Sequence, residues 1–450
     1  MRAVLMKSLL VVAVFLMLAA LCTPALVMAD EAVPAPAAAV PSAAPAPKID
    51  TGDTAWMIVA TALVMLMSIP GLALFYGGLA KTKDALNTMA MTFVTFCLVS
   101  VLWVFYGYTF AFGDDVRGII GSASKLFLKG VGPNSISDLA KTIPEYIFIV
   151  YQLTFAAITV ALASGAYIER MKFSAWIIFS VLWMTVVYLP IAHWVWGNGF
   201  LAKLGALDFA GGTVVHINAG IAALVGALIL GKRRDKAIIP GNLTLVVTGA
   251  GLLWFGWFGF NAGSALAASG LAGAAFINTN TATAVAALAW MFVEWKHSGK
   301  PTVLGLASGA VGGLVAITPA AGFVNIGGAI VIGIAAGVIP FYAVAKMKPR
   351  FGYDDTLDAF GIHGIGGTIG ALLTGVFADP AINDAGKGLL YGNPGQLLTQ
   401  FIAVGVTLVY SGVMTFVILM IIKAVLGVRV DAEDESVGLD ESQHGERAYN

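Results

Sequence analysis

The stretch GGTVVHINAGIAALVGALILGKRR, from Gly211 to Arg234, decides the fold. It places His216 near the start of an apolar run that ends in a basic cluster. Because a helix rises about 1.5 Å per residue, such a run of about twenty residues crosses the ~30 Å hydrocarbon core of a bilayer. A second stretch, DAFGIHGIGGTIGALLTGVFA from Asp358 to Ala378, has the same character and contains His363. The sequence therefore predicts membrane-spanning helices, two of which carry an imidazole.

The composition extends this prediction to the whole chain. Hydrophobic residues make up 59% of the 450 residues and charged residues only 11%, against about 25% in soluble domains. The 53 glycines suit closely packed membrane helices. A net charge of zero gives no reason to expect nucleic acid, and two cysteines, Cys22 and Cys97, argue against a disulfide framework or a cysteine-ligated metal. We therefore expect an all-α polytopic membrane protein without a cofactor.

The N-terminal segment differs from the rest of the chain. Arg2 and Lys7 give a positively charged region before an apolar segment, LLVVAVFLMLAAL, and the small residues of VMA before Asp30 suit a cleavage site. A Pro- and Ala-rich stretch without core-forming content follows. The predicted divisions are a signal peptide over 1–29, an Ala/Pro-rich linker over 30–50, a membrane domain over 51–427 and a cytoplasmic tail over 428–450.

Eleven segments read as transmembrane helices. Because the signal peptide puts the mature N-terminus outside the cell, an odd number of spans puts the C-terminus in the cytoplasm. Fifteen Lys and Arg residues fall in loops and helix ends assigned to the inside and six in loops assigned to the outside, which agrees with the positive-inside tendency. We expect a multi-pass protein of the inner cell membrane. The predicted spans are 54–79, 86–112, 144–168, 173–192, 212–230, 239–262, 274–295, 302–318, 324–345, 360–378 and 397–427.

The spans contain a weak internal repeat. GLALFYGGLA from Gly71 in the first span resembles GLLWFGWFGF from Gly251 in the sixth. His216 in the fifth span and His363 in the tenth are each followed by glycine four residues later. Because five spans separate the partners, the two halves have opposite orientation, and such inverted repeats place a substrate site near the membrane midplane. The predicted fold is therefore two inverted five-helix repeats plus a last helix.

The two deep histidines allow more than one interpretation. Ionisable groups at this depth are costly and mark pathways, although a single histidine is as well explained by a helix–helix hydrogen bond. Two at matching repeat positions favour function. A neutral imidazole has one donor and one acceptor nitrogen, so two in contact share a proton and offer polar sites to a small ligand. A bis-histidine haem site is the rival hypothesis.

Aromatic residues gather where several spans approach the outside. Tryptophan is enriched at membrane interfaces, so each residue alone is better explained by packing. Together they provide ring faces and a hydroxyl that could capture a small cation. The residues are Trp194 and Trp196 in HWVWGNG; Trp257, Phe258, Phe260 and Ser264 in GWFGFNAGSA; and Tyr151, Gln152 and Phe155 in YQLTFAAITV.

Two acidic residues precede the histidine-bearing spans. Asp208, eight residues before His216, would cap the helix and also supply a negative charge near the outer mouth. Asp358 is expected to be a structural cap at the cytoplasmic side. The two roles of Asp208 are compatible.

At these residues the chain resembles the ammonium transporter family (Amt/Mep/Rh), especially its bacterial Amt branch. The resemblance covers about residues 50–450 and rests on DFAGGTVVHINAG, GWFGFNAGSA, ERMKFSAW, FGIHGIGG and TPAAGFV in this order. It implies an eleven-helix homotrimer with one pore per subunit. Tyr151 stands where the family commonly has phenylalanine, and Asn198 where glycine is common.

The resemblance also implies roles for individual residues. Trp196 and Ser264 would form the outer ammonium site, with Phe155 beside them and Asp208 in support. Phe155 and Phe260 would stack as a gate. His216 and His363 would be twin histidines of the pore, which Trp257 also lines.

The function implied by the resemblance is ammonium transport for nitrogen uptake, not enzymatic catalysis. NH₄⁺ or methylammonium would be captured outside and deprotonated, and NH₃ would cross with or without the proton. The charged tail from Gly427 resembles a regulatory tail that assists a PII-type signalling protein, whereas its composition alone suggests disorder. An ammonium sensor and, within the family, CO₂ conduction are the remaining alternatives.

Overall fold

The fold was analysed in a computed structural model that describes residues 48–237 and 239–449. The predicted signal peptide and nearly all of the predicted linker lie outside the described residues. Within them, ten helical segments are long and apolar enough to cross a membrane, and an eleventh, α13, is a shorter apolar helix. These eleven segments match the predicted spans one for one, so the all-α polytopic fold is confirmed.

Several spans consist of more than one helix. In chain order the spans are Thr51–Leu79 (α2, Thr51–Leu66; α3, Ala73–Leu79), Thr82–Phe112 (α4, Ala85–Leu102; α5, Tyr108–Phe112), Glu145–Ala166 (α6, Glu145–Ala163), Phe173–Lys203 (α7, Phe173–Trp183; α8, Leu189–Trp196; α9, Phe200–Lys203), Gly212–Leu230 (α10, Asn218–Leu230), α11 (Leu243–Gly263), α12 (Gly270–Ser298), α13 (Val303–Ile317), Ile326–Phe351 (α14, Ile326–Tyr342; α15, Lys348–Phe351), Phe360–Phe377 (α16, Gly366–Phe377) and α17 (Pro394–Val425). A short helix, α18 (Ala432–Val437), follows in the tail.

Most of the breaks within spans are π-helical turns, whereas α8 and α9 are separated by a bend at residues 197–199. Such turns often mark functional sites because they widen the helix and redirect side chains. Two of them begin the histidine-bearing spans, over Gly212–Ile217 and Phe360–Ile365. The others are Met67–Leu72, Trp103–Gly107, Met184–Tyr188 and Ala343–Met347.

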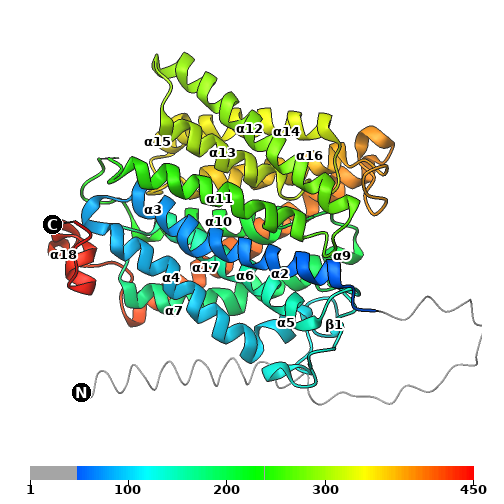
Figure 1. Ribbon diagram of the computed structural model, residues 1–450. Coiled ribbons are helices and arrows are strands. Elements are labelled where there is room, and N and C mark those ends of the chain that lie inside the picture. The colour runs from blue at the N-terminus through cyan, green and yellow to red at the C-terminus, as the bar shows by residue number, and fades with distance from the viewer. Residues whose placement is uncertain (1–47, 238, 450) are drawn as a thin grey trace, which may run out of the picture. The chain divides into compact units, whose positions relative to one another are not determined.

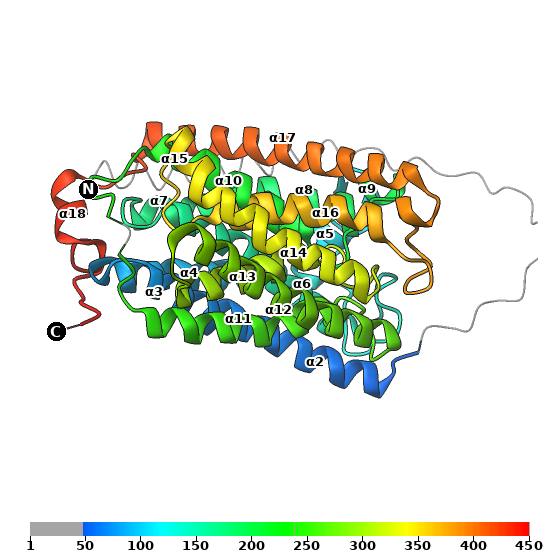
Figure 2. The same ribbon diagram turned by 90° about the horizontal axis from the view of Figure 1, so that it is seen from above.

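The spans lie side by side with their loops at two opposite ends (Figure 1). One end carries the antiparallel pair β1 (Asp115–Val116) and β2 (Ile120–Gly121), in which Asp115 pairs with Gly121. We call it the outer end, after the orientation that the sequence predicts, and the end with α18 the tail end. Figure 2 shows α17 along one edge of the bundle and α2 and α11 toward the opposite edge.

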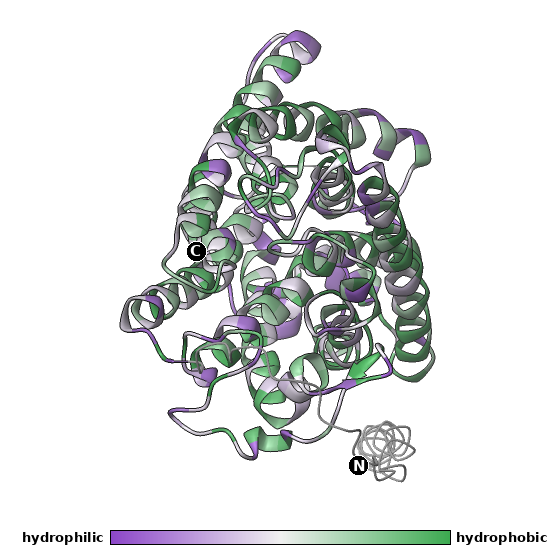
Figure 3. Ribbon diagram, turned by 90° about the vertical axis from the view of Figure 1, so that its right-hand side faces the viewer, coloured by the Kyte–Doolittle hydropathy of each residue, from purple (hydrophilic) through white to green (hydrophobic). Residues whose placement is uncertain are grey.

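The periphery of the bundle exposes apolar side chains, whereas the helices inside it pack closely. The helices are largely hydrophobic when viewed along the bundle in Figure 3, and α17 exposes Leu398, Phe401, Val409 and Phe416. Exposed apolar surface of this extent suits lipid or another subunit. Inside, helices approach through glycine: a Cβ on Gly249 of α11 would stand 2.3 Å from the nitrogen of Phe75 in α3. Helices of the two halves thus meet at backbone distance.

Candidate functional site

His216 and His363 lie together in the centre of the bundle, each almost fully buried. Their Nδ1 atoms are 3.2 Å apart, and their rings are nearly parallel, with an interplanar angle of 14°. One nitrogen must donate and the other accept, so the two rings hold opposite tautomers at Nδ1. Nε2 of His216 is buried without a hydrogen-bond partner among the described residues. The pair therefore has an unused polar atom for a small ligand.

Glycines at the crossing of the two spans bring the histidines into contact. A Cβ on Gly220 would stand 2.2 Å from the nitrogen of Gly364, and one on Gly367 would stand 3.0 Å from Cβ of His216. The contact is reciprocal, because each glycine follows its own histidine by four residues. The spacing of four residues from each histidine to its glycine therefore marks the place where the two spans cross.

Asp208 fixes the start of the His216 span. Its carboxylate accepts hydrogen bonds from the backbone N–H groups of Gly211, Gly212, Thr213 and Val214, and from the hydroxyl of Thr213. Burial raises the pKa of this carboxyl, and the hydrogen bonds oppose that shift. Asp208 thus caps the N-terminus of the His216 span. Its carboxylate points toward the helix start, and its main-chain oxygen accepts the Trp196 indole N–H at 2.9 Å.

Two phenylalanine rings lie next to the histidines on the outer side. Phe155 and Phe260 are stacked with centroids 4.2 Å apart, and both are buried. Phe260 lies 6.1 Å from the His216 ring, so the stacked pair adjoins the histidine pair directly. The two rings thus form an apolar contact between the histidine pair and Trp196.

Trp196 and Ser264 lie at the other side of the phenylalanine pair, and both are partly exposed. The Trp196 ring meets Phe155 edge to face, with centroids 5.7 Å apart. The Ser264 hydroxyl donates to the carbonyl of Phe260 and lies 3.2 Å from the Tyr151 hydroxyl. Tyr151 in turn donates to the Phe260 carbonyl at 2.8 Å. The hydroxyl of Tyr151 is therefore held between the Phe260 carbonyl and the Ser264 hydroxyl.

Trp257 packs on the remaining face of His216. Its ring lies nearly parallel to the imidazole, at 17° and 5.4 Å between centroids. Its indole N–H points away from the histidines and donates to the Thr318 hydroxyl at 2.8 Å. Trp257 thus packs beside His216, while His216 and His363 meet edge to edge through their Nδ1 atoms.

Within the described residues, three of those predicted near the outside form no ring contact or side-chain hydrogen bond with the histidine pair or the stacked phenylalanine pair. Trp194 packs on Tyr410 and donates to the carbonyl of Ile119. Phe258 stacks on Phe276, with centroids 3.9 Å apart. Gln152 is buried, and its side-chain oxygen has no hydrogen-bond partner among the described residues.

Asp355, and not Asp358, caps the His363 span, so the predicted capping role of Asp358 is wrong. The Asp355 carboxylate accepts the Phe360 N–H at 2.7 Å. Asp358 instead forms an ion pair with Lys348 at 2.6 Å. It has a left-handed backbone with φ of 59°, which turns its side chain away from the helix start. A cavity of about 360 Å³ reaches Asp358 and Ile362, next to His363.

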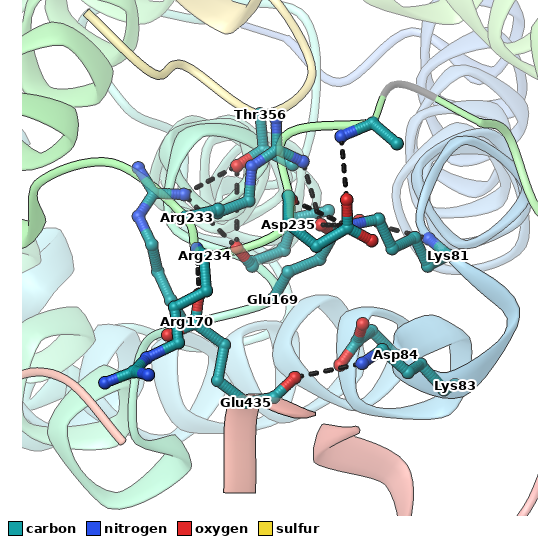
Figure 4. Close-up of polar contacts among 12 residues, drawn as sticks. Lys81, Lys83, Asp84, Glu169, Arg170, Arg233, Arg234, Asp235, Thr356 and Glu435 are labelled. Atoms are coloured by element: carbon teal, nitrogen blue, oxygen red, sulfur yellow. Dashed lines mark hydrogen bonds and ion pairs between the residues drawn. The ribbon is translucent and has the colours of Figure 1, made fainter. Parts of the chain in front are cut away.

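The tail end contains a buried ionic network that was not predicted from the sequence (Figure 4). Arg233 bonds to Glu169 at 2.8 Å and to Asp354 at 2.9 Å, and Arg170 donates to Thr356. Burial opposes ionisation of Asp354, but the hydrogen bonds from Arg233 outweigh it and lower its pKa to about 2. Glu169, Arg170 and Arg233 lie in ERMK and in the run GKRRDK, and their sequence does not indicate which charges pair.

The tail is folded onto the tail end of the bundle and is not disordered over the residues described. Glu435 accepts the backbone N–H of Arg234 and pairs with Arg429 at 2.8 Å. Asp440 accepts the N–H groups of Leu86 and Asn87, where α4 begins. These contacts join the tail to two loops of the membrane domain.

The geometry does not fit a haem between the histidines. An iron with two histidine ligands would need its nitrogens about 4 Å apart on opposite sides, given metal–nitrogen bonds of about 2.0 Å. The Nδ1 atoms are 3.2 Å apart and hydrogen-bonded to each other, which is too close for an iron between them. Among residues 48–237 and 239–449, no cluster of His, Cys, Asp and Glu forms a metal site.

Comparisons with known proteins agree with this arrangement. The model of the Ammonium Transporter Family matches residues 55–449. The ammonium transporter of Aquifex aeolicus (strain VF5) is 60% identical over 405 residues, which cover 90% of this chain and 94% of that protein. The ammonium transporter of Bacillus subtilis (strain 168) is 52% identical, with coverage of 88% and 98%.

Solved structures show the same fold. Saccharomyces cerevisiae Mep2 superposes with a TM-score of 0.80 at 38% identity, over 86% of this chain and 88% of that chain. A protein described as a sensor Amt protein gives a TM-score of 0.80 at 30% identity, over 87% and 98%. With its eleven spans, its central histidine pair and these matches over most of its length, the chain belongs to the ammonium transporter family.

Proposed function

We propose that this protein captures NH₄⁺ at Trp196 and Ser264, deprotonates it, and conducts NH₃ past His216 and His363, with or without the proton. The observation that carries the proposal is the contact of the two imidazoles, with Nε2 of His216 buried and free for a ligand. Burying two ionisable side chains in an apolar bundle costs free energy, so such a pair points to a function in binding or conduction.

Selectivity follows from the chemistry of the ion. NH₄⁺ and K⁺ have similar size, so a charged hole would not separate them. The Trp196 ring offers a cation–π face and Ser264 a hydroxyl, which together favour an ion that donates hydrogen bonds. Below them, the stacked rings of Phe155 and Phe260 exclude an ion that keeps its charge. NH₄⁺ can lose a proton and pass, whereas K⁺ cannot.

Asp208 supports the outer site in this proposal. Its carboxylate holds the start of the His216 span, and its carbonyl holds the Trp196 indole. The buried negative charge also lies on the route of an arriving cation. One residue thus orients both the outer site and the histidine pair.

The experiment is uptake and current in proteoliposomes. Methylammonium uptake and ammonium-evoked current are measured for wild type, His216→Ala and His363→Ala, with the exposed His297→Ala as the control. We expect both pore variants to lose flux or ammonium-over-K⁺ selectivity, and the control to retain them. Wild-type flux and selectivity in both pore variants would show that the histidine pair has no such role.

The setting of the transporter is part of the proposal. We infer a homotrimer in the inner cell membrane, with the N-terminus outside, a cleaved signal peptide over 1–29 and a linker over 30–50. The membrane domain would span 51–427, and the tail over 428–450 would lie in the cytoplasm. The exposed apolar faces of the helices would be covered by lipid and by the other subunits. A PII-type signalling protein would bind at the tail end.

Sensing is the second candidate function. It is favoured by the folded tail, whose Glu435 and Asp440 contact loops of the membrane domain, and by the likeness to a protein described as a sensor. Replacing residues 428–450 with a heterologous segment separates the two functions. Uptake that persists indicates that transport is primary, and uptake that disappears indicates that the tail is needed for transport.

A further inference from the structure

Thr318 is the one direct hydrogen-bond partner of the Trp257 indole N–H among the described residues. The Thr318 hydroxyl accepts this N–H at 2.8 Å, and its own proton has two acceptors within reach, the carbonyl of Leu314 at 2.7 Å and the side-chain oxygen of Asn261 at 3.2 Å. Trp257, Thr318 and the neighbouring Asn261 are all almost completely buried. The indole N–H therefore has its hydrogen-bond acceptor within the protein interior.

This anchor determines which part of Trp257 the histidines meet. With its N–H bonded to Thr318, the indole turns only its π face toward His216, at an interplanar angle of 17°. The same ring lies 5.3 Å from Phe260. The wall beside the histidine pair is consequently apolar, although it is built from a residue that carries a polar N–H.

We infer that Thr318 is a specificity-determining positioning residue, which keeps the polar edge of Trp257 out of the conduction path. The inference rests on the proposed function and deepens it. A buried N–H that loses its acceptor is destabilising, so it turns toward any group that can accept it. In the path, that group is water, and water beside His216 would admit ions that keep their charge. Thr318 thus protects the dryness on which discrimination against K⁺ depends.

The fold offers a matched control at another buried Trp–Thr pair. Trp183 of α7 donates its indole N–H to the Thr415 hydroxyl of α17, also at 2.8 Å, and both residues are fully buried. Trp183 stacks on Phe179 rather than on a histidine. Thr415→Val therefore removes the same kind of hydrogen bond, with the same change in volume, without altering the wall of the histidine pair.

The test compares four proteins in proteoliposomes: wild type, Thr318→Val, Thr318→Ser and Thr415→Val. We expect Thr318→Val to lose about tenfold in the ratio of ammonium-evoked to K⁺-evoked current, as 1.4 kcal/mol corresponds to a factor of ten. Its KM for methylammonium should stay within about twofold, because Trp196 and Ser264 are untouched. Thr318→Ser keeps the hydroxyl and should behave as wild type, as should Thr415→Val.

The outcomes distinguish a failure of the proposed function from a failure of the inference about Thr318. If wild type takes up no methylammonium, the proposed function fails. If wild type conducts selectively and Thr318→Val matches Thr415→Val in selectivity, the inference about Thr318 is overturned while the proposed function stands. A selectivity loss in Thr318→Ser equal to that in Thr318→Val would also overturn it, because the hydroxyl would then be irrelevant.

A double-variant cycle tests the same inference from the side of the indole. Trp257→Phe removes the indole N–H and keeps an aromatic face. In the Trp257→Phe background, Thr318→Val should cause no further loss of selectivity, because no N–H remains to be satisfied. A further tenfold loss in that background would contradict the inference.

Discussion

Gly220 lies against the backbone of Gly364, so that a Cβ at position 220 would stand 2.2 Å from the Gly364 nitrogen. This contact sets the separation of the two spans that carry His216 and His363. No flexible side chain is involved, so neither span can yield without moving its backbone. The 3.2 Å contact of the imidazoles depends on it.

Gly220→Ala should therefore separate the histidines. We expect a loss of stability of about 1–3 kcal/mol from overpacking, and a loss of most methylammonium uptake. Gly251→Ala is the control, because a Cβ there meets nothing within 4 Å. Both effects are read from thermal unfolding in detergent and from uptake in proteoliposomes. Normal uptake in Gly220→Ala would mean that the spans tolerate a wider crossing.

Trp196 and Trp194 provide a matched pair for the outer site. Trp196→Leu should raise the KM for methylammonium about 2- to 30-fold, since a cation–π contact contributes about 0.5–2 kcal/mol. Trp194→Phe should leave that KM unchanged, because Trp194 contacts Tyr410 and Ile119 instead. Uptake is measured over a range of methylammonium concentrations. Equal effects of the two substitutions would indicate a packing role for both rings.

The same two tryptophans show where sequence reasoning succeeds and where it stops. Residues two apart on a helix point about 200° apart, so only one of Trp194 and Trp196 can face the Phe155 ring. Composition and spacing alone give no way to choose between them, and the family resemblance supplied the choice. The histidine pair was different, because equal positions in two repeats, each with glycine four residues on, indicate a crossing.

Long-range polar partners were beyond prediction from one sequence. Arg233 bonds to Glu169, 64 residues earlier, and to Asp354, 121 residues later. A charge alone does not reveal which opposite charge it will meet after folding. The choice between Asp355 and Asp358 failed for a local reason. Both precede the span, and only the left-handed turn at Asp358 decides which carboxylate reaches Phe360.

Asp208→Asn should weaken the outer half of the path through its cap. An amide has one oxygen where the carboxylate has two, and its NH₂ group would face backbone N–H donors at the helix start. We expect a loss of about 1–3 kcal/mol in stability and reduced transport, because Trp196 and His216 both depend on this residue. Asp384→Asn, at an exposed position, is the control. Full stability of Asp208→Asn would show that the cap is dispensable.

Asp354 should make the protein sensitive to acid. Its pKa is lowered to about 2, because hydrogen bonds from Arg233 outweigh the effect of burial, whereas an unfolded aspartate has a pKa of about 3.9. The folded form thus binds fewer protons, so this contribution to stability is complete above about pH 4 and is lost as the pH falls toward 2. Thermal unfolding in detergent between pH 2 and 7 measures it.

Asp354→Asn should remove that pH dependence and lower stability at pH 7 by about 3–5 kcal/mol, as expected when one partner of a buried ion pair is lost. Glu441→Gln is the matched control, because Glu441 pairs with Arg447 at the surface, where such pairs contribute little. Its unfolding curve should follow wild type at every pH. If Asp354→Asn kept the wild-type slope between pH 4 and 2, another carboxylate would be responsible for the acid sensitivity, and the network around Arg233 would not be the element that holds the loops at the tail end.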